Sequence, residues 1–559
     1  MFLKTDIGRD FKKEELVFIP LGGVGEIGMN CYLYHFEDNW IMIDLGVTFK
    51  DDKVKNADLI LPDIEYITKK KDKLKAIILT HAHEDHIGAM PYLYNRLNDV
   101  PIYTTAFTAS VLKKKFLRTA SKDKQINLFE YNKRLKIGPF DIEVVALTHS
   151  IPEPNALVIR TKKGNIFHTG DWKIDPKPLV GNAIDEMKIK QISNDGIHVM
   201  VCDSTNVFNE KPSGSENDVR ESLKKIFAEK KNGKIIITCF ASNIARLETI
   251  GFVAKKYNRT CVLVGRSLRK MYESALENNY LNDLDSFISE KDGKNLPDEN
   301  IVLICTGSQG ESRAALYKLV YGNNLNFEVN LNDLVIFSSR EIPGNESQIN
   351  DLKNKLLKIG CHFKDHKNSM VHVSGHPSKS ELKKMYEWIK PDLIIPVHGE
   401  YQHLAEHAKF AVDSGISSSI LVENGDVIVI DKQGQSKKIF SVQTGRKVLK
   451  GSRILPADKK VFSNTNTINT EGDLLVIIVL DKDDNILSDP LIFSQTFLDE
   501  DDKIEKEEII DEINSHLNND FTNFVNDSFI EDFLKKKIRS FTKKKFGIKP
   551  ITNIKVIRV

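Results

Sequence analysis

The stretch His81-Ala-His-Glu-Asp-His86 is the most informative part of this sequence, because it places four metal-ligand side chains within six positions. It follows the apolar run AIILT and precedes the run IGAMPYLYNRL, so we expect it where a strand ends and the chain turns into a helix. In an extended turn, His81 and His83 project to the same side, and Asp85 and His86 follow where the chain bends. The motif therefore predicts two imidazoles facing one metal ion and a carboxylate with an imidazole facing another.

Three further residues with ligand chemistry follow strand-like runs elsewhere in the chain. His149 follows EVVALT, Asp171 ends NIFHTGD, and His398 follows DLIIPV. A polar group after an apolar run lies where a sheet edge presents functional side chains. Asp44, which follows WIMI, has the same placement. We expect Asp44 to orient a ligand imidazole from behind, since ligand histidines usually donate their second N–H to a carboxylate or carbonyl.

Composition limits the class of protein. The 559 residues include 80 Lys and Arg against 78 Asp and Glu, a formal net charge of +2. This balance excludes a highly basic, histone-like nucleic-acid binder but leaves room for local basic patches. Hydrophobic residues make up 41% and charged residues 28%, which is typical of globular chains. At about 100 to 200 residues per domain, we expect roughly three to five structural units.

The chain is expected to be a cytoplasmic protein with no membrane partner. Its longest aliphatic run, residues 474–480, is far shorter than the ~18 to 20 residues that span a bilayer. Charged residues interrupt the first apolar positions, so the N-terminus lacks the apolar core of a secretory signal. The six cysteines are scattered without a CxxC pair. They are predicted to be small core residues in a reducing compartment, neither disulfides nor zinc ligands.

The hydrophobic pattern changes along the chain and predicts its domains. Short β-branched runs over residues 1–207 favour a strand-rich α/β layer, and a similar pattern returns over residues 366–445. Between them, residues 208–365 alternate strands with helical periods, which indicates a parallel sheet with crossover helices inserted into the first domain. Residues 446–472 are predicted to be a linker. Residues 473–559 suffice for a small C-terminal α/β domain.

The metal-ligand pattern resembles the metallo-β-lactamase superfamily, whose paired metal ions lie at a sheet edge between two αβ layers. The resemblance implies that one Zn²⁺ is held by three histidines, His81, His83 and His149. A second Zn²⁺ is held by Asp85, His86 and His398, and Asp171 bridges the two ions. Nitrogen and oxygen ligands suit Zn²⁺, and Mn²⁺ or Mg²⁺ stay as alternatives for a site this rich in oxygen. Two ions about 3.5 to 4 Å apart would make a hydroxide and stabilise both oxygens of a phosphodiester displacement.

Three later motifs narrow the resemblance to the β-CASP branch, which processes nucleic acids: Cys202-Asp-Ser-Thr-Asn206, His372-Val-Ser-Gly-His376 and Pro396-Val-His-Gly-Glu400. In that branch, a histidine at the last motif, here His398, accompanies RNA substrates. The runs FASNIARL, VGRS, CTGSQGE and REIPGNESQ make the chain similar to the ribonuclease J family over nearly its whole length. The resemblance implies an α/β fold: a metallo-β-lactamase αββα sandwich with an inserted β-CASP parallel α/β domain and a small C-terminal α/β domain.

The resemblance also implies catalytic roles. His376 would be the general acid that protonates the leaving 3′ oxygen, a task suited to a group with an ordinary pKa of about 6.5. Asp203 would hold and polarise it. Two segments before expected helix starts at Pro377 and Ile244 would cradle the substrate backbone, including a 5′ monophosphate one nucleotide from the metals. These substrate-binding residues are His372, Val373, Ser374, Gly375 and His376, and Phe240, Ala241, Ser242 and Asn243.

The implied activity is a two-metal ribonuclease with 5′-to-3′ exonuclease and endonuclease action in rRNA maturation and mRNA decay. The implied partners are RNA, a second or further copies of the chain in a homodimer or homotetramer through the C-terminal domain, and a paralogue or RNA-decay partners. Two other functions stay open at the level of sequence. One is a small-molecule metallohydrolase of the same superfamily, and the other is a non-catalytic RNA-binding scaffold.

The C-terminal stretch FLKKKIRSFTKKKFG belongs to a segment, residues 533–559, with ten basic residues and no acid. Two interpretations stay open. The cations could contact RNA phosphates, each adding salt-sensitive affinity. Alternatively, they form the solvated side of an amphipathic helix whose inward side chains are apolar: Phe533, Leu534, Ile538, Phe541 and Phe546.

Overall fold

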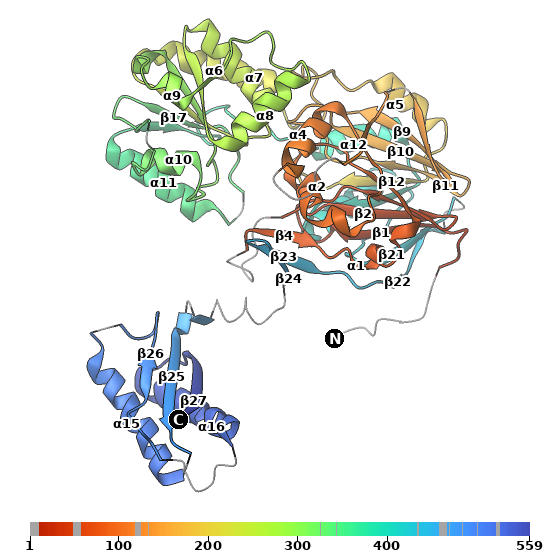
Figure 1. The fold of residues 1–559 in the computed structure, drawn as a ribbon. Coiled ribbons are helices and arrows are strands. Elements are labelled where there is room, and N and C mark those ends of the chain that lie inside the picture. The colour runs from red at the N-terminus through yellow and green to blue at the C-terminus, as the bar shows by residue number, and fades with distance from the viewer. Residues whose placement is uncertain are drawn as a thin grey trace. The chain divides into compact units, whose positions relative to one another are not determined.

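The computed structural model describes most of the chain: residues 11–48, 57–117, 124–131, 133–324, 326–342, 344–432, 435–457, 467–468, 470–482, 485–499, 501–520 and 526–559. These residues form two compact units (Figure 1). The first unit takes its described residues from Met1–Thr48 and Leu61–Arg446. The second takes them from Phe49–Ile60 and Lys447–Val559.

Two sheets form the centre of the first unit. The first sheet has the order β22-β21-β1-β2-β3-β5-β6-β7. Its strands are β1 (Leu16–Gly22), β2 (Cys31–Phe36), β3 (Asn39–Ile43), β5 (Leu74–Ile78), β6 (Ile102–Thr104), β7 (Ile126–Leu128), β21 (Asp426–Ile430) and β22 (Lys437–Ser441). The second sheet has the order β20-β19-β12-β11-β10-β9-β8. Its strands are β8 (Arg134–Ile137), β9 (Phe140–Ala146), β10 (Asn155–Thr161), β11 (Gly164–His168), β12 (Val199–Asp203), β19 (Leu393–Val397) and β20 (Ser418–Ser419).

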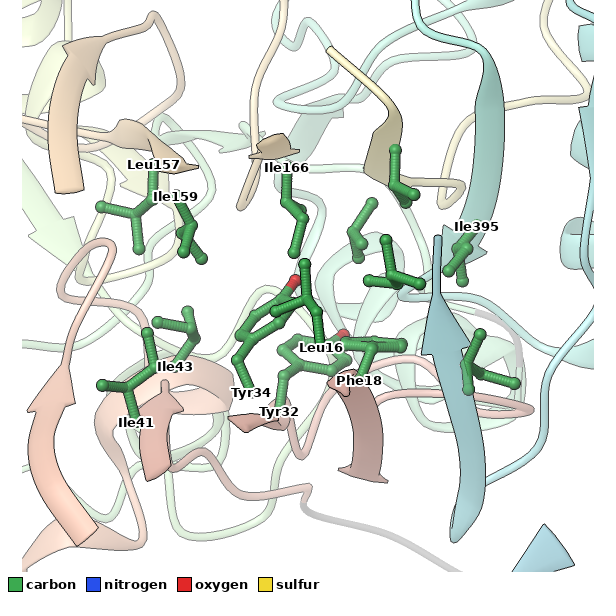
Figure 2. Packing of buried hydrophobic residues seen from close by; sticks show 14 of the residues in the cluster. Leu16, Phe18, Tyr32, Tyr34, Ile41, Ile43, Leu157, Ile159, Ile166 and Ile395 are labelled. Atoms are coloured by element: carbon green, nitrogen blue, oxygen red, sulfur yellow. The ribbon is translucent and has the colours of Figure 1, made fainter. Parts of the chain in front are cut away.

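The two sheets face each other across one apolar core. Side chains alternate along each strand, so Leu16 and Phe18 of β1 point to the same side and meet Ile166 and Ile395 of the second sheet (Figure 2). Each such buried side chain stabilises the fold by roughly 1.5 to 3 kcal/mol through leaving water. The sandwich thus fixes the strand ends of both sheets relative to each other.

Helices complete the layers of the first unit. The outer face of the second sheet packs on α5 (Glu186–Ser193), α12 (Lys379–Ile389) and α13 (Tyr401–Asp413). The other helical elements of this sandwich are short, apart from α4. They are α1 (Glu65–Thr68), η2 (Lys71–Lys73), α2 (Glu84–Ile87), α3 (Met90–Leu93), η3 (Tyr94–Arg96) and α4 (Ala106–Phe116).

An entire α/β domain is inserted between two neighbouring strands of the second sheet. Strands β12 and β19 pair in parallel, with Asp203 opposite Val397, although residues 204–392 separate them in sequence. Those residues include a parallel sheet of order β15-β14-β16-β13-β17-β18. Its strands are β13 (Ile235–Thr238), β14 (Thr260–Val264), β15 (Ile288–Ser289), β16 (Ile301–Cys305), β17 (Leu334–Phe337) and β18 (His362–Lys364). The predicted parallel sheet and its insertion are confirmed.

Crossover helices connect the strands of the inserted sheet: α6 (Glu216–Glu229), α7 (Ile244–Lys256), α8 (Arg266–Glu277), α9 (Glu290–Gly293), η4 (Asp298–Asn300), α10 (Ala315–Val320) and α11 (Glu346–Ile359). The inserted sheet has an apolar core of its own, which includes residues of β14, β16, β17, α10 and α11. All six cysteines of the chain are buried free thiols, as predicted for core residues.

The second unit contains a three-stranded sheet and two long helices. Strand β25 (Asp473–Leu480) lies between β26 (Leu491–Phe493) and β27 (Ile551–Arg558), antiparallel to the first and parallel to the second. Helices α15 (Lys503–Asp520) and α16 (Asp527–Phe546) bury apolar side chains against it. The expected small C-terminal α/β domain is present.

The stretch predicted as a linker, residues 446–472, is partly structured. It begins with a hairpin of β23 (Arg446–Lys450) and β24 (Arg453–Pro456), in a three-stranded sheet of order β24-β23-β4. Strand β4 is Leu59–Pro62. Short, charge-rich strands hide the period-2 pattern, so the sequence did not indicate this hairpin. Residues 458–466 and 469 lie outside the described residues.

Within the described part of the chain, none of the helices combines the length and the apolar character needed to cross a bilayer.

Candidate metal centre

The HAHEDH motif lies where it was predicted, between β5 and the short helix α2. His83 is the N-cap of α2, and its extended backbone marks the turn out of the strand. The helix expected over IGAMPYLYNRL is instead broken into α3 and the 3₁₀ turn η3. Pro91 lies in the first turn of α3, where its missing N–H is tolerated, but it prevents one continuous helix from α2.

Three histidines and one aspartate form the first ligand group: His81, His83, His149 and Asp171. His83 Nδ1 lies 3.0 Å from both His81 Nε2 and His149 Nε2. Around a tetrahedral zinc ion with bonds of about 2.0 to 2.1 Å, nitrogen ligands lie about 3.3 Å apart, so this spacing suits one shared ion. Burial lowers the pKa of all three imidazoles, that of His83 to about 4. They are therefore neutral, as metal ligands must be.

The second ligand group contains two aspartates and two histidines: Asp85, His86, Asp171 and His398. His86 Nε2 lies 3.2 Å from Asp171 Oδ1, and His398 Nε2 lies 3.2 Å from Asp85 Oδ2. Burial opposes protonation of His86 and His398, but the surrounding carboxylates outweigh it and raise the pKa of both. A cation is therefore favoured here, and a divalent ion would take the place of the protons.

Asp171 belongs to both groups, with Oδ1 facing His86 and Oδ2 3.8 Å from His81 Nε2. Two buried atoms of this cluster, Asp171 Oδ2 and His398 Nε2, have no hydrogen-bond partner among the described residues. Leaving such atoms unpaired is costly in a protein interior, and a metal ion would satisfy both. The donors are imidazole nitrogens and carboxylate oxygens, which fit Zn²⁺. The residues present therefore fit two divalent ions that share Asp171.

Hydrogen bonds fix the orientation of the ligand rings. His86 Nδ1 donates to Asp44 Oδ2 at 2.7 Å, and the backbone N–H and hydroxyl of Thr80 also donate to Asp44 at 2.8 Å. His149 Nδ1 donates to the backbone oxygen of Gly375. Each bond turns Nε2 of its ring toward the ligand group. Asp44 therefore contacts the ring of a candidate ligand on the side away from the ligand group.

The sequence did not indicate several residues that support the motif. Thr80 Oγ1 lies 3.1 Å from His81 Nδ1, and Asn30 Nδ2 lies 3.0 Å from His86 Nε2. A Cβ on Gly46 would lie 1.6 Å from the backbone oxygen of Asp85, so only glycine permits this approach. Thr80 directly precedes the HAHEDH motif, and Gly46 lies two residues after Asp44. These positions beside predicted site residues were the only sequence signal for the two supporting residues. Asn30 had none.

His376 and Asp203 form a hydrogen-bonded pair beside the ligand groups. His376 Nδ1 donates to Asp203 Oδ2 at 2.7 Å. Burial alone would lower the pKa of His376, but the charges of Asp203 and Asp171 raise it above its ordinary value. The His376 side chain is 24% exposed, so its ring still reaches solvent. The pair can hold a proton at His376 close to the candidate metal ligands.

Arg246 joins the chain next to the two segments that were predicted to cradle phosphate. Its guanidinium donates to the backbone oxygen of Val371 at 2.8 Å, directly before His372. Helix α7 begins at Ile244 as expected, and the Asn243 side chain caps it by accepting from the Arg246 N–H. Phe240 is partly exposed. His372 is half-buried, and its buried Nδ1 has no hydrogen-bond partner among the described residues.

One helix start differs from the expectation. Helix α12 begins at Lys379, with Ser378 as its cap and Glu381 completing the capping box, instead of at Pro377. The serine–glutamate pair outcompetes proline as the start signal, since it satisfies two backbone N–H groups at once. The N–H of His376 is bound to Ser374 Oγ. The segment 372–376 is therefore a turn that precedes the helix, and its N–H groups are not part of the helix terminus.

Models of three domain families match successive parts of the chain. "Beta-lactamase superfamily domain" matches residues 39–192, "Ribonuclease J, beta-CASP domain" residues 232–356, and "Zn-dependent metallo-hydrolase RNA specificity domain" residues 363–421. The chain is 39% identical to Ribonuclease J of Sinorhizobium meliloti, over 98% of each chain. The chain belongs to the ribonuclease J family. It is a metal-dependent ribonuclease with the metallo-β-lactamase, β-CASP and C-terminal arrangement of that family.

More distant members of the ribonuclease J family give the same result. The chain is 34% identical to Ribonuclease J of Helicobacter pylori, covering 86% of this chain and 70% of that protein. It is 31% identical to Ribonuclease J of Thermus thermophilus, covering 85% and 84%. A crystal structure of a protein of unknown function from Enterococcus faecalis shares the fold, with a TM-score of 0.53 and 18% identity over 74% of this chain and all of that one.

Proposed function

We propose that this ribonuclease hydrolyses RNA phosphodiesters at a pair of Zn²⁺ ions, removing nucleotides from a 5′-monophosphate end and also cutting internally. The observation that carries the proposal is the bridging position of Asp171 between two ligand groups, with the His376–Asp203 pair beside them. Mn²⁺ or Mg²⁺ are the alternative ions for the same ligands. The cellular roles we propose are rRNA maturation and mRNA decay.

The seven candidate ligands would hold the ions as two groups, His81, His83 and His149 in one and Asp85, His86 and His398 in the other, with Asp171 shared. When bound, the ions would activate a water molecule at neutral pH and neutralise charge on the phosphate. Asp44 and Gly375 hold the rings of His86 and His149, so the ligand set is organised before any ion arrives.

His376 is the proposed general acid. Because Nδ1 is bound to Asp203, the proton available for transfer lies on Nε2 when the ring is protonated. The carboxylates of Asp203 and Asp171 raise the pKa of His376 and so favour the protonated ring. The ring would give it to the 3′ oxygen as the phosphodiester bond breaks. Asp203 then stabilises the orientation of the ring and its charge in the protonated state.

The 5′ monophosphate is proposed to bind between the segments 240–243 and 372–376. Arg246, just after the first segment, donates to the backbone oxygen of Val371, just before the second. Nδ1 of His372, which has no hydrogen-bond partner among the described residues, supplies a polar atom there. Ser374 and Gly375 give the turn small side chains that let a phosphate approach its backbone. A pocket for a monophosphate at a fixed spacing from the ions would favour a free 5′ end over a triphosphate.

The wider setting of the activity is part of the same proposal. We place it in the cytoplasm, in keeping with six buried free thiols. We also propose homodimers or homotetramers formed through the second unit, with a paralogue or RNA-decay proteins as further partners.

One experiment tests the reaction and the end preference together. A 3′-labelled RNA, carrying either a 5′ monophosphate or a 5′ triphosphate, is followed during digestion by the wild-type chain and by Asp85→Ala. We expect the monophosphate form to disappear without discrete labelled intermediates while the triphosphate form decays more slowly. Equal decay of both forms would refute the 5′-phosphate pocket, and full activity of Asp85→Ala would refute the ligand assignment.

A further inference from the structure

Helix α16 of the second unit presents a row of cations to an open hollow of about 460 Å³. Every residue that lines the hollow is polar, and all but one are basic: Lys536, Arg539, Ser540, Lys543, Lys544 and Lys549. Positions 536, 539, 540 and 543 follow the three- and four-residue spacing of one helix face. The stripe from 536 to 544 extends about 12 Å along the helix axis.

The opposite face of α16 fixes the direction of this stripe. Ile530, Leu534 and Ile538 are fully or almost fully buried in the core of the second unit. Phe541 and Phe546 pack against the same core. The helix therefore cannot rotate without exposing these side chains, and its cations stay directed into the hollow.

Among the residues that the structure describes, the cations of the hollow have no acidic ion-pair partner, unlike their neighbours. Elsewhere in the second unit, Lys545 pairs with Glu508 and Lys555 with Glu531. Within the part of the chain that the structure describes, no carboxylate forms an ion pair with a basic residue of the hollow; Lys543 Nζ donates to the backbone oxygen of Gly547 instead. The one carboxylate bonded to a residue of the hollow among the described residues, that of Glu471, accepts from the backbone N–H of Lys549 and not from its ammonium group. Like charges gathered in this way repel one another, and a bound anion would relieve the repulsion.

We propose that this hollow is a second RNA-binding site, which contacts phosphates of the strand without reading its bases. The inference rests on RNA as the substrate in the proposed function. Lysine, arginine and serine are the side chains that contact nucleic-acid phosphates. A stripe of this length reaches about two or three successive phosphates of one strand. Among the described residues, no apolar or aromatic side chain lines the hollow. This disfavours a protein partner, since protein interfaces centre on such anchors.

The test compares two full-length variants that lose the same charge. The hollow variant is Lys536→Gln, Arg539→Gln, Lys544→Gln, which leaves Lys543 and its bond at the helix end in place. The control variant is Lys537→Gln, Lys545→Gln, Lys555→Gln, in the same unit but outside the hollow. Binding of a labelled single-stranded RNA is measured over a range of KCl concentrations with a chelator present, so that the RNA stays intact. Circular dichroism and the thermal midpoint check that both variants fold.

For single strands, the slope of log affinity against log salt is about 0.7 per neutralised phosphate. Loss of three contacts should therefore reduce the slope of the hollow variant by about 2 and leave the control variant close to wild type. Equal slopes for the hollow variant and the wild type would overturn the proposal. So would unchanged RNA binding combined with loss of self-association in light scattering, because the hollow would then contact another protein chain.

Cleavage gives a separate readout. Asp85→Ala should lose hydrolysis yet keep the salt slope, because Asp85 belongs to the first unit and not to the hollow. If Asp85→Ala cleaves normally, the ligand assignment fails while the slope comparison still decides the RNA-binding site.

Discussion

Arg246 donates through its guanidinium to the backbone oxygen of Val371, 2.8 Å away, so a helix of the inserted sheet holds the segment that leads to His376. The same guanidinium pairs with Glu216 at 3.1 Å and donates to the backbone oxygen of Ser338 at 2.8 Å. Arg246 is fully buried, and Glu216 is 2% exposed. The inserted domain thereby takes part in positioning the candidate general acid.

Arg246→Met should destabilise the first unit by about 3 to 5 kcal/mol, because it leaves the buried charge of Glu216 without a partner. The free energy of unfolding in urea measures this. The double variant Arg246→Met, Glu216→Gln should recover part of the loss, and Lys255→Met, on an exposed site of the same helix, should change stability by less than about 0.5 kcal/mol. If Arg246→Met is as stable as Lys255→Met, the ion pair of Arg246 and Glu216 does not stabilise the first unit.

Asp85→Ala should reduce the bound metal from two ions to one per chain, because it removes a ligand of the second group only. Elemental analysis of the purified protein measures the ratio. RNA hydrolysis should fall at least about 100-fold, since both ions act on the phosphodiester. Glu84→Ala is the matched control, because Glu84 is the neighbouring carboxylate, outside both ligand groups, and pairs with Lys115. Two retained ions in Asp85→Ala would disprove the grouping.

His376→Ala should retain both ions and lower kcat by about 10² to 10⁴, the usual contribution of a general acid. His362→Ala, an exposed histidine on β18, serves as the control for loss of an imidazole. Wild-type turnover in His376→Ala would end the assignment. Loss of metal in this variant would mean that the ring acts as a ligand.

Asp203→Asn should shift the pH profile of kcat. The Asp203 carboxylate raises the pKa of His376, so its removal lowers that pKa. A general acid works in its protonated form, and activity is lost as pH rises through its pKa. The alkaline limb of the profile should therefore move to lower pH in Asp203→Asn, measured at saturating RNA. An unmoved limb would show that Asp203 does not act through His376.

A chain that ends at Arg446 should keep the folded first unit, since the sandwich and the inserted sheet have their own cores. If the second unit drives assembly, this chain should be a monomer by light scattering. The full-length chain at the same concentration should be a dimer or tetramer. If both proteins form assemblies with the same number of chains, the interface lies in the first unit.

The candidate ligands could be predicted because the chemistry of the site is concentrated in a short motif. HAHEDH places four ligands in six positions, and His149, Asp171 and His398 each end a strand-like run. Strand ends of two facing sheets meet at one edge, so these residues come together even though they are far apart in sequence. The parallel inserted sheet was predictable for a similar reason, since its strands and helices alternate regularly.

The supporting contacts could not be predicted, because they join side chains to backbone atoms distant in sequence. No local pattern indicates that Arg246 reaches Val371, or that Asn30 lies beside His86. The capping box of Ser378 and Glu381 is visible in the sequence, but the prediction placed the helix start at Pro377 instead. The β23–β24 hairpin was missed because short charged strands lack a clear alternation.

The insertion between β12 and β19 has a consequence for the newly made protein. A ribosome synthesises β12 long before β19, so the edge of β12 stays unpaired until the inserted domain has emerged. His398, the last candidate ligand, follows β19 directly. A nascent chain or a fragment that stops before this point lacks a complete second ligand group. The second ligand group can therefore be completed only after the whole inserted domain has been synthesised.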